Sequence, residues 1–331
     1  MNKKKILELL GSFRNKTVGV FGDLIADEYV YGNSSRVSRE APVLILKFRS
    51  RKIVPGGGGN SALNMATLGA KVVFFGYADN SPVAEELLNS MEKSGIDTKN
   101  IIRTDEYLTP TKTRILAGGP HSSKQQVIRI DNEKKVKISA GLENKLIKNL
   151  EKFIKHLDAI VISDYALGTV SNNVIKKLQD YNKGHGILIS VDSRYDLARF
   201  RNISLATPNE WELREIFGKN IRTQRDIIKY GMMLKEKLRA KNLIITQGSS
   251  GMTVFDEEIN KIPIVGSDEV ADVTGCGDTV IAAATLALST GLPLLIAGKL
   301  ANHAGGIAVN KRGTAPVYLS ELKKSVNLFW E

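Results

Sequence analysis

The feature that most limits the possible folds is an alternation of short β-branched runs with helical segments in the second half of the chain. Runs at 159–163, 186–191 and 242–246 are rich in Val and Ile, and each is followed by a polar or glycine turn. Such apolar runs are typical of strands buried on both faces of a parallel sheet. The sequence therefore predicts an α/β fold with a doubly wound, mostly parallel sheet, in which ligands gather at the carboxyl ends of the strands.

Two segments, at about 29–50 and 104–131, interrupt this alternation. The first contains strand-like stretches at 29–32 and 42–49, and the second contains 111–116 and 125–130 around a turn at 118–120. We expect these strands to form a small β-sheet outside the main layer, inserted in a single domain that spans residues 1–331. Such a sheet would be placed to act as a lid over the edge of the main sheet.

Charge and composition narrow the function classes. The net charge is +12, from 47 basic and 35 acidic residues, but the basic residues are scattered and are not interleaved with aromatic residues, so a nucleic-acid partner is not expected. Solvated lysine faces and attraction of phosphorylated ligands both remain open. No run approaches the ~18 apolar residues of a membrane span. The start of the chain predicts an amphipathic helix rather than a signal peptide, and the single Cys276 excludes an internal disulfide, so we expect a cytoplasmic location.

A glycine turn precedes the most apolar helix of the sequence. The stretch 272–279 reads Asp-Val-Thr-Gly-Cys-Gly-Asp-Thr and is followed by an Ala-rich run at 280–288. Backbone N–H groups at such a helix start, together with the helix dipole, form an anion site over Gly275 to Gly277. Asp278 falls in the first helical turn, where a carboxylate either stabilises the helix terminus or takes a proton from a bound hydroxyl.

Two further segments carry polar groups at predicted helix starts. Pro55 is followed by four glycines and Asn60, and Asn60 and Asn64 share one face of the helix expected at 61–68; a flexible linker is the alternative for the glycine run. Asn209 and Glu212 could hold a hydrated Mg²⁺ ion or could form a capping box. Glycine patterns of P-loop and dinucleotide-binding proteins are absent, as is the nucleophile elbow of the Ser-His-Asp hydrolases.

Taken in order, four motifs of the chain resemble those of the ribokinase-like (PfkB) sugar kinases. They are Gly-Gly-x-x-Asn near the start, Asn-x-x-Glu after Thr207-Pro208, Thr-x-Gly-x-x-Gly at 246–251, and Asp-x-x-Gly-x-Gly-Asp at 272–278. The resemblance runs from about Thr17 to Ser320. It implies a ribokinase-like fold and a phosphotransferase that uses ATP and Mg²⁺ to phosphorylate a small sugar.

The resemblance also implies roles for individual residues. Asp278 would be the base that takes the sugar hydroxyl proton, with the N–H groups of Gly275, Cys276 and Gly277 as the anion hole. Asn209 and Glu212 would organise Mg²⁺ through water. The residues at the nucleotide would be Thr246, Gly248, Gly251, Asp272, Thr274 and Asn302. The sugar would meet Asp23, Gly57, Gly58, Asn60, Asn64 and Asp164. The family further suggests a homodimer formed through the lid sheet.

Several details within the family resemble the kinases that make heptose 1,7-bisphosphate. They include the segments 36–42, 125–131, 163–168 and 313–316, and Asp278-Thr279-Val280 in place of Asp-Ala-Phe. A substrate with a 7-phosphate needs cationic partners, for which we expect Arg36, Lys112, Arg114, Arg129 and Arg194. Two departures are Cys276 in place of the usual Ala, and Asp192-Ser193-Arg194 in place of Asp-Pro-Lys.

The resulting expectation is in-line transfer of the ATP γ-phosphoryl group to the anomeric hydroxyl of D-glycero-β-D-manno-heptose 7-phosphate. The chain is expected to comprise the kinase alone, without the adenylyltransferase domain that is fused to it in some relatives. The alternatives are a kinase for another sugar or sugar phosphate, such as a fructose phosphate, and a catalytically silent sugar-phosphate sensor on the same fold.

Overall fold

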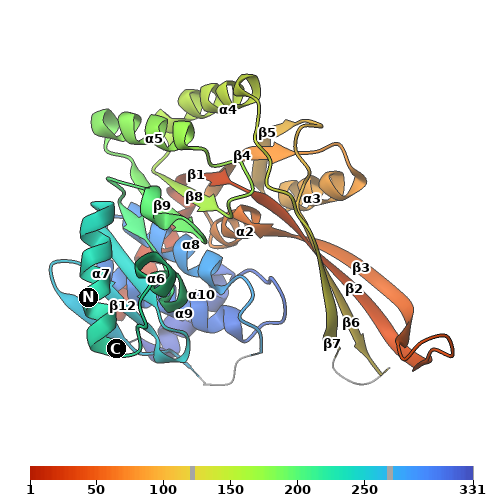
Figure 1. Cartoon of the computed structure of the whole chain (residues 1–331). Coiled ribbons are helices and arrows are strands. Elements are labelled where there is room, and N and C mark those ends of the chain that lie inside the picture. Colours follow the sequence, from red (N-terminus) through yellow and green to blue (C-terminus); the bar gives the residue numbers. More distant parts are fainter. Residues whose placement is uncertain (120–123, 267–270, 331) are drawn as a thin grey trace.

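A nine-stranded sheet runs through the centre of the molecule (Figure 1). In the computed structural model, which describes residues 1–119, 124–266 and 271–330, the strand order is β13-β12-β11-β10-β9-β8-β1-β4-β5. Neighbouring strands from β11 to β5 are parallel, whereas β11, β12 and β13 pair antiparallel at one edge. The strands are β1 (Thr17–Gly22), β4 (Lys71–Ala78), β5 (Ile96–Arg103), β8 (Ala159–Asp164), β9 (Leu188–Ser193), β10 (Leu205–Ala206), β11 (Asn242–Thr246), β12 (Met252–Phe255) and β13 (Ile259–Ile262).

The sheet is buried on both faces, because its strands are apolar at consecutive positions. Val18 and Val20 of β1 belong to one hydrophobic core and Phe21 to the other, and residues 72–75 of β4 alternate between the two cores in the same way. Each fully buried side chain of this kind stabilises the fold by about 1.5–3 kcal/mol. The arrangement confirms the doubly wound α/β sheet expected from the sequence.

Helices cover each face of the sheet. One face carries α1 (Lys3–Gly11), α2 (Gly58–Thr67), α3 (Pro82–Lys93), α8 (Cys276–Ser289), α9 (Leu294–Val309) and α10 (Leu319–Phe329). The other carries α4 (Ala140–Phe153), α5 (Asn172–His185), α6 (Glu210–Phe217) and α7 (Gln224–Leu238). Within the described parts of the chain, no helix combines the length and the apolar character needed to cross a bilayer.

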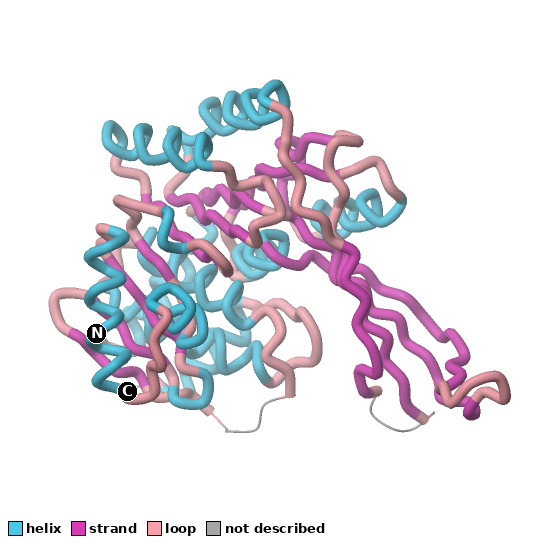
Figure 2. The backbone as a smooth tube through the Cα atoms, viewed as in Figure 1, coloured by secondary structure: helices cyan, strands magenta, loops and turns pink. Residues whose placement is uncertain are grey.

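A second, four-stranded sheet projects from the body as an arm (Figure 2). Its order is β3-β2-β6-β7, with strands β2 (Leu24–Val37), β3 (Leu44–Gly57), β6 (Thr111–Gly118) and β7 (Gln125–Asn132). β2 and β3 are 14 residues each, longer than the stretches predicted at 29–32 and 42–49. The sequence predicts that the glycine run leads into a helix, whereas Gly56 and Gly57 pair with Ile25 and Leu24 and so extend the ladder. Of the expected turn at 118–120, residue 120 lies outside the described residues.

Two helices that carry motif residues begin at glycine turns. α2 begins at Gly58, three residues before the predicted start, so part of the glycine run is helical. Gly57 has φ 55°, a left-handed conformation that favours glycine. α8 begins at Cys276, and its first turn contains Asp278 as predicted. Both helix starts face the carboxyl end of the central strands, which positions the site described next.

Candidate active site

The glycine turn before α8 is fixed by close packing. Gly275 has φ 75° and precedes the first residue of the helix, and a Cβ atom at this position would lie 2.4 Å from the side-chain nitrogen of Asn60. A larger residue would therefore be both strained and sterically excluded. Gly277 has open space above it, since the nearest atom to a Cβ there would be Asp192 Oδ2 at 3.9 Å. The turn thus presents its backbone to a cavity, as an anion-binding helix start requires.

Asp278 is buried and held from both sides of its carboxylate. Oδ2 accepts a hydrogen bond from Asn60 Nδ2 at 2.8 Å, and Oδ1 accepts from Ser61 Oγ at 3.2 Å and from Tyr165 Oη at 3.1 Å. Burial is the largest cause that raises the pKa of Asp278 to about 7, and repulsion from Asp192 is the second. The three hydrogen bonds act in the opposite direction. A carboxylate with a pKa near neutrality is suited to accept a proton from a hydroxyl and to release it again.

A charged cavity of about 250 Å³ opens over Asp278. Its wall includes four carboxylates and one cation: Asp164, Asp192, Glu212, Asp278 and Arg194. Burial and mutual repulsion raise the pKa of Asp192, and burial raises that of Glu212, while Arg194 lowers both. Arg194 and Asp164, both predicted to contact the substrate, thus line the same cavity as Asp278. Asp192, Tyr165 and Trp211 also line this cavity and were not predicted as site residues.

Asn209 and Glu212 form the capping box that the sequence left as one of two possibilities. Asn209 Oδ1 accepts from Glu212 N and Glu212 Oε2 accepts from Asn209 N, both at 2.9 Å. Both residues nevertheless line the charged cavity. Across the described ranges, no cluster of three or more His, Cys, Asp and Glu residues is arranged to bind a metal directly. The donor set fits a hydrated divalent cation, because carboxylate and amide oxygens line the cavity and Mg²⁺ retains several waters.

A second cavity, of about 300 Å³ and largely apolar, adjoins the first. Predicted nucleotide residues Thr246, Gly248, Gly251 and Asn302 line it, together with Met252, Ile264, Val265, Val280 and Val309. Cys276 lines it as well, and burial raises the pKa of this thiol to about 11, so the group stays protonated and acts as a small apolar side chain. The cavity suits a flat, mostly apolar group such as a nucleobase.

Asn209, Val273 and Gly277 line both cavities and so form their common wall. Asp272 and Thr274, which were predicted at the nucleotide, line neither cavity. Asp272 Oδ1 accepts from Thr274 N at 2.9 Å and Thr274 Oγ1 at 2.7 Å, and Asp272 Oδ2 accepts from Gly313 N at 2.9 Å. This arrangement shapes the approach to the glycine turn and does not point either side chain at the cavities.

Two residues predicted at the sugar are occupied by internal hydrogen bonds. The carboxylate of Asp23, fully buried at the end of β1, accepts from three backbone N–H groups in the loop 165–169. Asn64 Nδ2 donates to Asn60, and Asn64 Oδ1 accepts from Val317 N at 3.0 Å. Gly57 and Gly58 are buried at the start of α2, where Gly58 N donates to Asp23 O. Of the predicted sugar-binding set, Asn60 and Asp164 are the residues that this arrangement brings to Asp278 or to its cavity.

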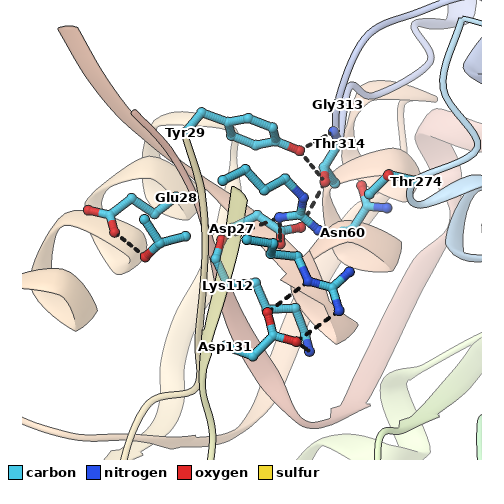
Figure 3. Close-up of polar contacts among 12 residues, drawn as sticks. Asp27, Glu28, Tyr29, Asn60, Lys112, Asp131, Thr274, Gly313 and Thr314 are labelled. Carbon is cyan, nitrogen blue, oxygen red and sulfur yellow. Dashed lines mark hydrogen bonds and ion pairs between the residues drawn. The ribbon is translucent and has the colours of Figure 1, made fainter. Parts of the chain in front are cut away.

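The arm cations predicted to hold a phosphate are paired within the arm (Figure 3). Lys112 contacts Asp131 and Glu133, and Arg129 contacts Asp131. Arg114 is 7% exposed and pairs with Asp27, which sequence reasoning missed. The pairing was missed for two reasons. The alternation of residues along the strand does not show which side chains face inward, and the partner of Arg114 lies 87 residues earlier in the chain. Arg36 is exposed on the arm. Arg194 is the expected cation that reaches the charged cavity.

Asp27 also joins the arm to the loop that precedes α10. Thr314 Oγ1 donates to Asp27 Oδ2 at 2.7 Å, and the Tyr29 hydroxyl accepts from Thr314 N at 2.7 Å (Figure 3). Gly313 donates to Asp272, two residues before Thr274. The base of the arm is therefore connected by direct contacts to the segment that leads into the glycine turn.

The chain is similar to known proteins in both sequence and structure. Residues 15–320 match the pfkB family carbohydrate kinases. The chain is 33% identical over 319 residues to the bifunctional protein HldE of Sulfurimonas denitrificans, and 35% identical over 304 residues to that of Aliarcobacter butzleri. These alignments cover 96% and 92% of this chain but 65% and 63% of the relatives, so the chain spans about two thirds of their length or slightly less.

Solved structures show the same fold at lower sequence identity. Escherichia coli phosphofructokinase-2, crystallised with substrates and products, superposes with a TM-score of 0.77 at 18% identity, covering 95% of this chain and 99% of that one. Arabidopsis thaliana ribokinase, complexed with ribose and ATP, gives a TM-score of 0.68 at 17% identity, with 94% and 98% covered.

The fold and the site together define a ribokinase-like phosphotransferase that acts on a sugar. The chain belongs to the pfkB family of carbohydrate kinases. The apolar cavity and the charged cavity of this chain lie side by side and share a wall.

Proposed function

We propose that this kinase transfers the ATP γ-phosphoryl group to the anomeric hydroxyl of D-glycero-β-D-manno-heptose 7-phosphate. The observation that carries the proposal is the common wall of the two cavities, formed by Asn209, Val273 and Gly277. A nucleotide with its base in the apolar cavity would direct its phosphates over the glycine turn, toward Asp278. The choice of heptose 7-phosphate rests on the similarity to the HldE proteins and on the sequence details given above.

The residues of the site divide the chemistry between them. Asp278 takes the proton of the sugar hydroxyl as its oxygen bonds to the γ-phosphorus, while the bond from that phosphorus to the β–γ bridging oxygen breaks and ADP leaves. The backbone N–H groups at the start of α8 stabilise the oxygens of the transferring group. Glu212 and Asn209, through water, and Asp192 by its charge would hold Mg²⁺ near the phosphates. Bound Mg²⁺ supplies charge neutralisation at the phosphate oxygens. Arg194 adds a fixed positive charge at the same cavity.

The proposal extends to assembly and location. Large apolar side chains are exposed on the arm: Val37, Val43, Leu44, Phe48, Val127, Ile128 and Ile130. The most exposed of them, Phe48, has 67% of its surface accessible. An exposed apolar sheet surface of this kind is typical of an interface with another chain. A homodimer that pairs the two arms accounts for this surface, and we place the enzyme in the cytoplasm.

The test is ADP release with Mg·ATP across heptose 7-phosphate, fructose 6-phosphate, fructose 1-phosphate, ribose and unphosphorylated heptose. We expect turnover with heptose 7-phosphate at a kcat/KM at least ~10²-fold above the others, because a buried site left with unpaired polar groups rejects the wrong ligand strongly. The control is the Asp278→Asn protein, in which turnover of every sugar should fall ~10²-fold or more. Preference for a fructose phosphate would retain the kinase and overturn the substrate, and silence on all of them would favour a sugar-phosphate sensor.

A further inference from the structure

A short loop after β8 brings Tyr165 to the carboxylate of Asp278. The loop is attached to Asp23 by three backbone hydrogen bonds: Tyr165 N at 2.9 Å and Leu167 N at 3.2 Å to Oδ2, and Thr169 N at 3.1 Å to Oδ1. Asp23 is fully buried, so these amides replace water as the partners of its carboxylate. The side chain of Asp23 therefore serves the loop as an internal anchor.

The backbone of this loop is held in an uncommon conformation. Ala166 has φ 59° and Gly168 has φ 122°, and a Cβ atom at Gly168 would lie 2.1 Å from the carbonyl oxygen of Val136. A non-glycine residue in the left-handed region is uncommon and persists where its surroundings fix the chain. The three hydrogen bonds to Asp23 supply that restraint on either side of Ala166.

Tyr165 is in contact with the candidate base and with the charged cavity. Its hydroxyl lies 3.1 Å from Asp278 Oδ1, and its side chain lines the cavity next to Asp192 and Arg194. Burial and the neighbouring carboxylates raise the pKa of Tyr165 well above its usual value, so the hydroxyl keeps its proton and donates a hydrogen bond to Oδ1. Asn60 donates to the other oxygen, Oδ2. Hydrogen bonds to both oxygens therefore restrict rotation of the carboxylate about its Cβ–Cγ bond.

We propose that Tyr165 is a positioning residue for Asp278, and that Asp23 acts on the site through Tyr165 by anchoring the loop 165–169. The inference rests on the proposed role of Asp278 as the base. It assigns Asp23 a different task from the sugar contact that the family resemblance suggested. In this view the hydrogen bond from Tyr165 orients Oδ2 toward the incoming hydroxyl and favours the ionised carboxylate that the reaction uses.

Removal of the hydroxyl has a defined consequence. Hydrogen bonds to a charged carboxylate lower its pKa, so loss of one raises it. Two titratable groups besides Tyr165 face Asp278. Asp192 on β9 is charged and raises the pKa of Asp278, whereas Cys276, in the same helix as Asp278, stays neutral. The charge of Arg194 faces Tyr165. These groups are unchanged in Tyr165→Phe, which keeps the ring and removes only the oxygen atom.

The first experiment compares Tyr165→Phe with the wild-type enzyme in steady-state kinetics across pH 5.5–9. We expect kcat to fall about 10-fold or more, KM for both substrates to change less than about 2-fold, and the acid limb of kcat to move upward by about 0.5–1 pH unit. Tyr195→Phe is the matched control, because Tyr195 is 62% exposed and its ring position under Arg194 is preserved. An unchanged acid limb in Tyr165→Phe would overturn the positioning role.

The second experiment tests whether Asp23 acts through Tyr165. Asp23→Asn places an amide against backbone N–H groups and should move the acid limb in the same direction as Tyr165→Phe, and it should add nothing further in the double variant. A residue that binds sugar directly would instead raise the sugar KM in both backgrounds, which would overturn the anchor role. Should Asp23→Asn not fold, Gly168→Ala displaces the same loop without altering either side chain, and we expect it to reproduce the shift.

A third measurement separates this inference from the proposed function. The carboxyl carbon of Asp278 can be titrated by ¹³C NMR in the ligand-free protein, with Asp278→Asn used to assign the signal. An upward shift in Tyr165→Phe supports the inference even if no sugar is turned over, in which case the kinase assignment fails alone. An unshifted titration in an enzyme that is otherwise active overturns the inference and leaves the kinase assignment intact.

Discussion

The side-chain amide of Asn60 joins Asp278 to the glycine turn, since Asn60 Nδ2 lies 2.8 Å from Asp278 Oδ2 and 3.2 Å from the carbonyl oxygen of Gly275. Asn64 in turn donates to Asn60 Oδ1 at 3.1 Å, which fixes the orientation of the amide. Helix α2 therefore sets the geometry at the start of α8. The two glycine-rich segments of the sequence, 215 residues apart, form a single structural unit around one carboxylate.

Substitution of Asn60 by Ala should weaken catalysis more than folding. The loss of a hydrogen bond to a buried charged group costs about 1.5–3 kcal/mol, which corresponds to roughly a 10- to 10²-fold lower kcat if the loss is expressed in the transition state. Steady-state kinetics and urea unfolding measure the two effects. Asn310→Ala is the control, because Asn310 makes one exposed hydrogen bond to Gly306 O at the end of α9. Equal kinetic effects of the two substitutions would contradict the role of Asn60.

Asp278→Asn should keep ligand binding and lose turnover. The amide preserves the size of the side chain but cannot take the proton, so kcat should fall ~10²-fold or more. Loss of the carboxylate as a helix cap explains little of this, because a lost cap costs only ~1 kcal/mol of stability. Isothermal titration with ATP and with sugar phosphate measures binding separately from turnover. Near-normal turnover in this variant would refute the assignment of the base.

The wild-type enzyme should gain activity as pH rises through neutrality. Burial and Asp192 raise the pKa of Asp278 to about 7, so the carboxyl is largely protonated below that pH and ionised above it. A base must be ionised, and kcat should therefore rise about 10-fold per pH unit below pH 7 and level off above about pH 8. The profile is measured with a coupling system that is itself constant over the range. A flat profile from pH 5.5 to 8 would show that Asp278 does not titrate in the rate-limiting step.

Asp192→Asn should stabilise the protein at alkaline pH. Burial and repulsion from Glu212 raise the pKa of Asp192 in the folded state, so the unfolded chain releases its proton first and the free energy of unfolding falls as pH rises from about 4 to 7. Above this pH range the ionised carboxylate has its full destabilising effect on the folded state, and below this range it has no such effect. The amide removes this effect, and we expect about 1–3 kcal/mol of added stability at pH 8 and no change at pH 4. Thermal unfolding at both values, without divalent metal, is the measurement.

Much of the fold could be predicted from the sequence, because local patterns and packing agree there. The bounds of β11 were predicted to the residue, and the first turn of α8 was placed correctly around Asp278. Strand β3 was predicted too short because the glycine run was expected to lead into a helix, whereas β3 continues to Gly57. Gly56 allows β3 to pack closely against the side chain of Asp27, since a Cβ atom at Gly56 would lie 2.6 Å from Asp27 Oδ2.

The candidate site was predictable only where a motif was local. The glycine turn and the Asn-x-x-Glu capping box are contained in a few residues, and both form as their spacing indicates. Partners that are distant in the sequence were not predictable. Asp192 lies near the end of β9, where many other strands also carry polar residues, and nothing local shows that its charge acts on Glu212. The pairing of Arg114 with Asp27 depends on the register between β2 and β6. The sequence therefore indicated which charged residues lie at the edge of the sheet, but it did not indicate which residues they interact with.

The Asp27–Arg114 ion pair should prove essential to the arm, and its neighbour Lys112 on the same strand provides the comparison. The side chains of Asp27 and Arg114 are 7% and 8% exposed, and Thr314 Oγ1 completes the bonding of the carboxylate. Removal of one member of a buried pair leaves an uncompensated charge, which destabilises proteins by about 3–5 kcal/mol. We therefore expect Arg114→Met to lower the free energy of unfolding by roughly that amount, and Asp27→Asn in the same chain to restore part of it. Lys112→Met should cost ~1 kcal/mol or less, because its acidic partners are more exposed. Urea unfolding of the four proteins decides the matter: equal losses for Arg114→Met and Lys112→Met, or no recovery in the double variant, would show that the stability of the arm does not depend on this pair.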